Sequence, residues 1–234
     1  MKPPRTTWGD FPDVLIHAGE SRVKQHTAYP AAKSGGGGAA IRLVRDTLNA
    51  QQVDALATLL VEHRPILVSA HAYERGGVNA IPEIFADELG KRLVWSVDAG
   101  VVQVNVVAHT GADGFARLAR QAGFDGPIQA GMEYVLVDDF VGMGGTLANL
   151  RGYIELQGGK VLAAVALTGK PYSAQLKLTT ARLAELRNKH GRKLEHWWQD
   201  RFGHAFDALT ESEARYLVRT PDADTLRNRI ITAE

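Results

Sequence analysis

Apolar residues recur at helical and strand-like intervals through the middle of the chain. From Ala39 they return every three or four positions until residues 64–65, where Arg-Pro ends the pattern. Ile66 to Val68 is a short apolar run typical of a buried strand. Asn79 to Leu89 returns to helical spacing, and Gly90 is expected to cap that helix. The pattern therefore predicts a helix, a strand and a second helix in succession.

The same alternation continues to residue 167. Further strands are predicted at Leu93 to Val97, Val101 to Val107, Val135 to Val137 and Val161 to Leu167, and helices at Phe115 to Gln121 and Thr146 to Leu156. Strands that alternate with helices imply crossover connections, so we expect an α/β fold with a mostly parallel central sheet flanked by helices. Ligands bind such sheets beyond the carboxyl ends of the strands, where the glycine-bearing loops 70–77 and 142–146 fall.

The two ends of the chain differ from this middle part. Residues 1–38 are irregular in pattern, with four prolines and the run Gly35 to Gly38, and are expected to form an N-terminal hood or linker. Residues 39–170 are the predicted core, and residues 171–234 a helical extension that belongs to the same compact unit. In this extension two helices are expected at Leu178 to Asn188 and Leu194 to Leu209. A capping box at residues 210–213 is expected to open a third helix, and a last short helix should follow the break at residues 220–222. The extension could serve as a lid, a dimer contact or an interaction element.

Composition narrows the class of protein. The 234 residues are 45% hydrophobic and 23% charged, which fits a globular chain. A net charge of +1 argues against nucleic-acid binding along the whole chain. The chain has no cysteine, which excludes disulfides and thiolate chemistry and suits the cytoplasm. Neither a signal-peptide pattern nor an apolar stretch of about 20 residues occurs, so a soluble cytoplasmic protein without membrane contact is expected.

The stretch 133–151 carries the chemistry. An apolar strand leads into Asp138 and Asp139, and Gly142 to Thr146 then precede a helix. Bare backbone N–H groups at a helix N-terminus form a phosphate site, and the Thr146 hydroxyl adds a donor. The two acids would repel that phosphate, so they require a neighbour with donors, such as a vicinal diol or a divalent cation. The order therefore indicates a phosphate at the loop and a ribose at the acids.

Two better-known phosphate loops do not fit. The nucleoside-triphosphate loop needs Lys and then Ser or Thr after its second glycine, whereas Thr146 follows Gly145 directly. The dinucleotide fingerprint needs a third small residue where this chain has Leu147.

VLVDDFVGMGGTL, residues 135–147, resembles the 5-phosphoribosyl-1-diphosphate (PRPP) signature of the type I phosphoribosyltransferases. The resemblance implies that Asp138 and Asp139 hold the ribose hydroxyls. It implies that the 5-phosphate is wrapped by Gly142, Met143, Gly144, Gly145 and Thr146. The family often has Thr or Ser where this chain has Gly142 and Met143, so one or two hydroxyl donors are missing.

Residues 66–91 resemble the family's strand, diphosphate loop and following helix. The implied diphosphate site consists of Ala70, His71, Ala72, Tyr73, Glu74, Arg75, Gly76 and Gly77. Guanidinium and bare amides are suitable donors for a diphosphate, so Arg75 is expected to attend the leaving group. The resemblance covers roughly residues 64–169 and indicates no subfamily.

The resemblance implies a pentosyltransferase that displaces diphosphate from PRPP with a nitrogen nucleophile, commonly a nucleobase. Mg²⁺ is the implied cofactor, bound by Asp138 and Asp139 directly or through ribose hydroxyls, and a homodimer is expected. The family's mobile loop would fall at His109 to Gly114, which lacks Lys and Arg. We therefore hypothesise that Lys24 or His26 supplies the missing cationic contact. The alternative is a non-catalytic regulator or effector that binds PRPP or a nucleotide.

Each of these residues also has a simpler interpretation. Adjacent aspartates at a strand end can be a solvated turn, and Arg75 can be a surface residue. The eight histidines show no metal-ligand spacing, and Trp197-Trp198 fits packing better than base stacking. Residues 17–33 are rich in basic side chains and fit either a plain basic loop or a hood over the site.

Overall fold

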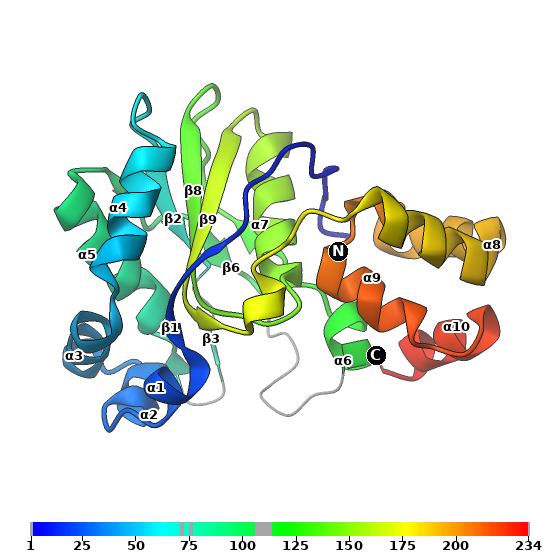
Figure 1. Cartoon of the computed structure of the whole chain (residues 1–234), viewed down its shortest axis with the longest axis horizontal. Helices are drawn as coiled ribbons and strands as arrows, with labels where there is room; N and C mark the ends of the chain where they lie inside the picture. The colour runs from blue at the N-terminus through cyan, green and yellow to red at the C-terminus, as the bar shows by residue number, and fades with distance from the viewer. Residues whose placement is uncertain (1, 71–72, 75–76, 106–113, 234) are drawn as a thin grey trace.

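A computed structural model describes residues 2–70, 73–74, 77–105 and 114–233. Its centre is a five-stranded sheet in which every neighbouring pair is parallel (Figure 1). In spatial order the strands are β1 (Leu15–Gly19), β9 (Lys160–Gly169), β8 (Glu133–Val141), β2 (Ile66–Ser69) and β5 (Val97–Asp98). The prediction of a mostly parallel sheet is confirmed.

The order of the strands indicates where in the sheet a ligand crevice is expected. From β2 the chain moves outward to β5 and then returns to the other side of β2 to form β8 and β9. The direction of winding therefore reverses between β2 and β8. A parallel sheet has its ligand crevice at such a reversal, beyond the carboxyl ends of the two strands.

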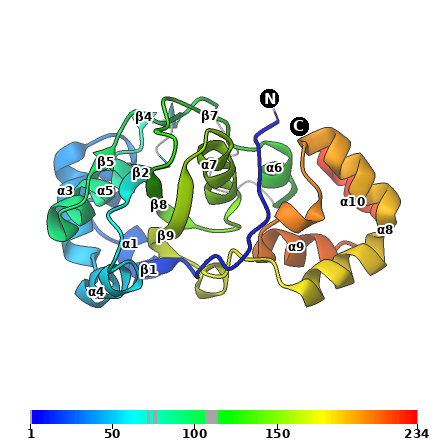
Figure 2. The same ribbon diagram turned by 90° about the horizontal axis from the view of Figure 1, so that it is seen from above.

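Helices cover both faces of the sheet (Figure 2). One face is covered by α3 (Gly37–Thr47), α4 (Ala50–Leu59) and α5 (Ile81–Leu93), and the other by α7 (Gly145–Leu156). Successive side chains of a strand point to opposite faces, and β8 follows this rule. Val135 and Val137 pack with the α3–α5 layer, whereas Tyr134 and Leu136 pack with α7. Burial on both faces explains why β8 is apolar over consecutive positions.

Two helix boundaries differ from the prediction. The helical stretch from Ala39 divides into α3 and α4, because the Asn49 side chain accepts the Gln51 N–H (2.9 Å) and begins a new helix. The predicted cap Gly90 lies inside α5, and Val94 (φ 56°) ends this helix instead. Gly90 is required by close packing, since a Cβ there would lie 2.8 Å from Val97 Cγ2. The predicted strand at Leu93 to Val97 is consequently reduced to Val97–Asp98.

No helix or strand was predicted within residues 1–38, and the structure corrects this. They contain edge strand β1, then α1 (Glu20–Lys24) and α2 (Tyr29–Lys33), and α3 starts within the glycine run at Gly37. The apolar run Val14 to Ile16 is too short to indicate a strand without its partner β9. The N-terminal segment therefore belongs to the sheet and to its carboxyl edge.

Two short antiparallel strand pairs and one short helix accompany the sheet. The pairs β3 (Tyr73–Glu74) with β4 (Gly77–Val78) and β6 (Val102–Gln103) with β7 (Phe124–Asp125) are antiparallel. The strand predicted at Val101 to Val107 is regular only at β6, and residues 106–107 lie outside the described residues. The short helix α6 (Gly114–Ala119) matches the helix predicted at Phe115 to Gln121.

The C-terminal unit consists of α8 (Thr180–Phe202), α9 (Glu211–Val218) and α10 (Ala223–Thr232), with short 3₁₀ turns at Pro171–Ser173 and Phe206–Ala208. The two helices predicted before residue 209 form α8, in which Gly191 (φ 75°, ψ 167°) interrupts the helical backbone. The capping box is confirmed, since Thr210 and Glu213 exchange hydrogen bonds of 3.0 and 2.9 Å. Within the described chain, no helix has the length and apolar character needed to cross a membrane.

The first part of the chain, residues 2–11, runs without helix or strand between α7 and the C-terminal unit (Figure 2). Arg5 pairs with Glu213 of α9 at 2.6 Å, and its Nε donates to Asn149 Oδ1 of α7 at 2.6 Å. Both partners of the ion pair are almost fully buried, with side-chain exposures of 2% and 3%. Trp8 Nε1 donates to Leu209 O at 2.8 Å. This segment therefore ties the C-terminal unit to the sheet.

The packing of residues 2–11 against α7 is tested by two glycine substitutions with opposite expected effects, one at this contact and one on open surface. A Cβ at Gly152 of α7 would lie 2.0 Å from Pro4 O, so Gly152→Ala should lower the free energy of unfolding by about 1 to 3 kcal/mol. A Cβ at Gly38 of α3 would meet no atom within 4 Å, so Gly38→Ala should raise it by about 0.4 to 1 kcal/mol. Urea unfolding midpoints measure both, and equal shifts of the same sign would contradict the packing described.

Candidate functional site

The loop after β8 presents bare backbone donors. Gly144 adopts φ 81°, which favours glycine, and α7 starts at Gly145, one residue before the predicted Thr146. Within the described chain, the N–H groups of Gly145 and Thr146 donate to no protein acceptor. Such N–H groups carry the positive end of the helix dipole, so this loop can bind an anion.

Asp138 and Asp139 lie inside β8, three and two residues before its end at Val141. Both are buried, with 7% and 9% of their surface exposed. Asp138 Oδ1 accepts the Asp139 N–H at 2.7 Å. Burial raises the pKa of the Asp138 carboxyl well above its usual range, and the negative charge of Asp139 raises it further. A buried acid with a raised pKa next to a crevice is a mark of a functional site.

Asp139 is paired with a cation from the N-terminal segment. Lys33 Nζ at the end of α2 lies 2.9 Å from Asp139 Oδ2, and the Lys33 side chain is 22% exposed. The density of basic residues at 17–33 pointed to a role for this segment, but the hypothesis named Lys24 and His26. Sequence spacing could not show that α2 returns to the carboxyl end of β8.

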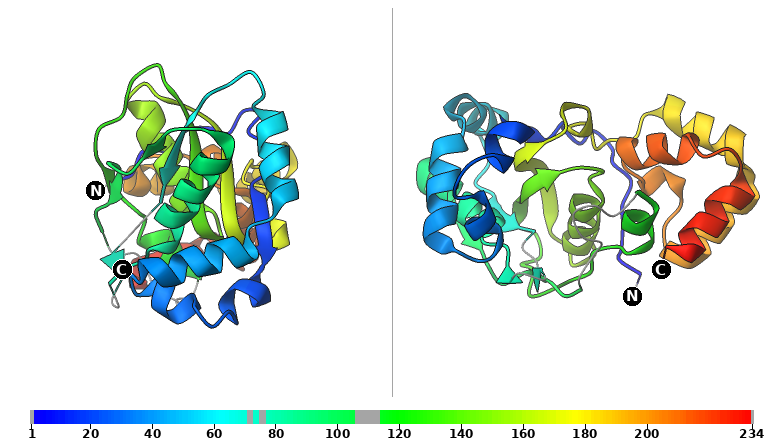
Figure 3. Two further views of the ribbon diagram at one scale, coloured as in Figure 1. Left: turned by 90° about the vertical axis from the view of Figure 1, so that its left-hand side faces the viewer. Right: turned by 90° about the horizontal axis from the view of Figure 1, so that it is seen from below.

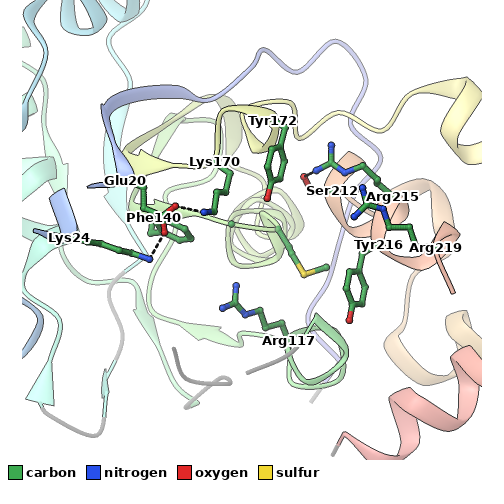
Figure 4. A pocket seen from close by; sticks show the side chains of 12 residues that line it. Glu20, Lys24, Arg117, Phe140, Lys170, Tyr172, Ser212, Arg215, Tyr216 and Arg219 are labelled. Atoms are coloured by element: carbon green, nitrogen blue, oxygen red, sulfur yellow. Dashed lines mark hydrogen bonds and ion pairs between the residues drawn. The ribbon is translucent and has the colours of Figure 1, made fainter. Parts of the chain in front are cut away.

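A cavity of about 480 Å³ opens beside the loop (Figure 4). The right-hand view of Figure 3 looks from below onto the carboxyl edge of the sheet, with α1 and α2 on one side and the C-terminal unit on the other. Segments from both sides line the cavity together with the loop itself. The lining residues are Glu20, Lys24, Arg117, Phe140, Gly142, Met143, Lys170, Tyr172, Ser212, Arg215, Tyr216 and Arg219.

The cavity is strongly basic. Its carboxylate Glu20 binds Lys170 and Lys24, with a Lys24 Nζ to Oε1 distance of 2.5 Å, and these bonds lower the pKa of Glu20. Lys24 Nζ also lies 4.6 Å from the centre of the Phe140 ring. The Arg215 guanidinium lies 4.5 Å from the centre of the Tyr172 ring. The face of an aromatic ring attracts a cation, so these contacts help to hold Lys24 and Arg215 at the cavity wall.

The structure brings some of the predicted residues together and not others. Lys24, Gly142 and Met143 line the cavity. His26 does not, because its Nε2 lies 3.1 Å from Asp46 Oδ2. Ala70 is buried, and its N–H donates to Val137 O at 2.8 Å, which places the loop start beside β8.

The rest of the diphosphate loop is described only as backbone. Tyr73, Glu74 and Gly77 belong to the β3–β4 hairpin, whereas His71, Ala72, Arg75 and Gly76 lie outside the described residues. Of the predicted mobile loop, residues 109–113 also lie outside them, and Gly114 begins α6.

Sequence reasoning missed nine of the twelve cavity residues, among them Arg117, Lys170, Tyr172, Arg215, Tyr216 and Arg219. A signal existed for Lys170 and Tyr172, because they follow the carboxyl end of β9, where ligands gather. Arg215 and Arg219 are four apart and so share a helix face. Their approach to the β8 loop depends on how the C-terminal unit packs, which no local pattern encodes.

Asp138 and Asp139 are poorly placed to bind Mg²⁺ directly and are better suited to contact it through a bound ligand. The described residues hold no group of three or more His, Asp or Glu side chains arranged for a metal ion. Asp138 is buried with a raised pKa, and Asp139 is paired with Lys33, so neither offers an open carboxylate. Direct ligation of Mg²⁺ by both acids therefore does not fit, whereas contact through hydroxyls of a bound ligand does.

Two curated proteins are similar to this chain in sequence. A protein named TraN from Escherichia coli is 39% identical over 229 residues, which cover 98% of this chain and 51% of that protein. An uncharacterized protein from Haemophilus influenzae is 37% identical over 151 residues, which cover 64% of this chain and 34% of that protein. This chain thus spans about half of the length of the first relative and about a third of the second. No family model matches the chain.

Solved structures similar to this chain are phosphoribosyltransferases, the family that the sequence motif resembles. An adenine phosphoribosyltransferase is 18% identical with a TM-score of 0.35, over 52% of this chain and 70% of that chain. A purine phosphoribosyltransferase from Pyrococcus horikoshii is 23% identical with a TM-score of 0.34, over 52% of this chain and 73% of that chain. The assignment of the fold class rests on the sheet order and loop geometry described above.

The raised pKa predicts that removing the Asp138 charge stabilises the chain. A carboxyl whose folded pKa exceeds its unfolded value stabilises at low pH, and that contribution is lost as the pH rises through the folded pKa. Asp138→Asn keeps the acceptor for the Asp139 N–H, so at pH 7 it should raise the free energy of unfolding by about 1 kcal/mol. This gain should vanish near pH 4.

Asp125→Asn is the matched control, because Asp125 is exposed and its Oδ1 likewise accepts the next N–H, that of Gly126, at 2.9 Å. It should change the free energy of unfolding by less than about 0.5 kcal/mol. Loss of stability in Asp138→Asn at pH 7 would contradict the electrostatics described.

Proposed function

We propose that the chain binds PRPP across the carboxyl ends of β2 and β8 and transfers its phosphoribosyl group to a nitrogen nucleophile, with release of diphosphate. The observation that supports this most is the order along β8 and α7: two buried carboxylates, a glycine loop and a helix with bare N–H groups, placed where the sheet reverses. Acceptors for a diol and donors for a phosphate therefore follow each other closely along the chain.

The loop would hold the 5-phosphate. The N–H groups of Gly145 and Thr146 and the Thr146 hydroxyl are donors at a helix N-terminus, and each hydrogen bond to a charged group contributes roughly 1.5 to 3 kcal/mol. Lys24 lines the cavity beside this loop and could bind the phosphate as a cation. Its ion pair with Glu20 would then break, and Glu20 would keep its ion pair with Lys170. The contact of Lys24 with the phosphate would offset the hydroxyl donors that Gly142 and Met143 lack.

The carboxylates would hold the ribose and the developing charge. Displacement of diphosphate from C1 leaves positive charge on the sugar ring, which nearby carboxylates stabilise. Asp139 accepts from Lys33 in this structure, and ribose hydroxyls would replace or share that contact. Mg²⁺ carried by the diphosphate would neutralise the leaving group. The diphosphate itself is assigned to loop 70–77, with Arg75 as its cation.

The test combines binding with turnover. The protein is titrated with PRPP and Mg²⁺ by calorimetry and is then incubated with a panel of nitrogenous bases while diphosphate release is followed. Thr146→Val, which removes one hydroxyl, should weaken PRPP binding about tenfold or more. Thr58→Val on the exposed side of α4 should have no effect. Absence of PRPP binding by the unaltered chain would refute the proposal.

A non-catalytic regulator is the second candidate, and the Lys33–Asp139 ion pair favours it. A carboxylate already neutralised by an ammonium stabilises a cationic transition state less. In the same assay, heat from PRPP without diphosphate release for any base would identify a sensor rather than a transferase.

The cation hypothesis is tested by a pair of neighbouring residues. Lys24 lines the cavity, whereas His26 is engaged by Asp46 outside it. Lys24→Ala should therefore reduce turnover at least several-fold, and His26→Ala should leave it unchanged. Equal effects of the two variants on steady-state rates would remove Lys24 from the site.

A further inference from the structure

Three arginines converge on the cavity without acidic partners. Arg117 comes from α6, Arg215 from α9 and Arg219 from the end of α9 (Figure 4). Across the described residues, no carboxylate lies within ion-pair distance of any of them. The lysines of the cavity differ, because Lys24 and Lys170 share Glu20. Concentrated positive charge at one opening indicates an anionic ligand.

Aromatic side chains stand beside these arginines. Tyr172 is 59% exposed, and its ring lies under the Arg215 guanidinium. Tyr216 follows Arg215 on the same helix. Figure 4 shows Tyr172 and Tyr216 on the α9 side of the cavity, with Phe140 across from them. An exposed ring such as that of Tyr172 can stack on a flat ligand, whereas the Tyr216 ring packs against Phe115 (5.0 Å between ring centres) and adds its edge to the wall. The wall therefore combines surfaces for a planar ring with donors for an oxyanion.

The wall is made of other residues than those assigned to PRPP. The cavity shares Lys24, Gly142 and Met143 with the proposed phosphate site, and among the described residues its lining includes none of Asp138, Asp139 and Thr146. The arginines and tyrosines of the wall come from α6, α9 and the turn after β9, and none of them is assigned to PRPP. The 5-phosphate and ribose already have their own groups in the proposed function. The arginines are therefore left for a different part of the bound ligands.

We propose that the C-terminal unit completes the acceptor subsite and selects an acidic acceptor, a planar nitrogenous ring that carries a carboxylate or phosphate. Arginine binds both oxyanions through a fork of two parallel hydrogen bonds, which fixes the ring as well as attracting it. A neutral base would make no use of these side chains. This inference rests on the proposed function and specifies its second substrate.

The experiment uses ring pairs that differ only in charge. With PRPP and Mg²⁺ present, binding is measured for pyridine-3-carboxylate against pyridine-3-carboxamide, for uracil-6-carboxylate against uracil, and for phenyl phosphate against phenol. The acidic member of at least one pair should bind tenfold or more tightly than its neutral partner. A preference in the first two pairs would indicate a carboxylate as the acidic group, and a preference in the third pair would indicate a phosphate.

Variants then assign the preference to the arginines. Arg215→Gln and Arg219→Gln should each reduce the acid preference at least threefold and together abolish it, while PRPP affinity stays within about twofold. Arg227→Gln on exposed α10 of the same unit is the matched control and should change neither quantity. A preference that survives the double variant, or no preference in a chain that binds PRPP, overturns this proposal alone. Failure to bind PRPP overturns the proposed function instead.

Discussion

The buried pair Asp138 and Asp139 is the constraint on which the site depends. Two neighbouring carboxylates in the centre of a sheet repel each other and lose hydration, and burial has already raised the pKa of one of them. The fold compensates partly with Lys33, which reaches Asp139 from the N-terminal segment. A chain that keeps such a pair accepts a stability cost, and functional sites are where such costs persist. The N-terminal segment therefore supplies the cation that compensates this pair, as well as the edge strand β1 of the sheet.

The loop beside these acids is held from behind by the C-terminal unit. Thr210 Oγ1 donates to Met143 O at 2.5 Å, and a Cβ at Gly144 would lie 2.4 Å from Leu176 Cδ2. The Arg5–Glu213 pair closes against Gly145 from the same side. A backbone fixed in this way keeps its N–H groups aimed before a ligand arrives, which reduces the entropy lost on binding. The extension thus connects the position of the loop to the basic wall of the cavity.

Much of the sheet could be predicted from the sequence, because β2, β8 and β9 are apolar at consecutive positions and the glycines mark their ends. The glycine loop at the start of α7 and the place of the two acids near the end of β8 were also predictable, since order and spacing along 13 residues carry that information. Strand β1 was not, because a short edge strand gains its stability from β9, about 150 positions away. Lys33 and the arginines of α6 and α9 were missed for the same reason. Each is an ordinary surface cation in sequence, and only packing between distant segments gives it a position at the site.

The central claim is that the N–H groups at the start of α7 grip a phosphate whose sugar meets the acids of β8. Amide NMR of ¹⁵N-labelled protein, titrated with PRPP and Mg²⁺, tests it most directly. The account predicts the largest shifts at Gly145 and Thr146, saturating together with those of Asp139, and no shift at these amides with inorganic diphosphate alone. Saturable shifts confined to other parts of the chain, with Gly145 and Thr146 unmoved, would contradict it.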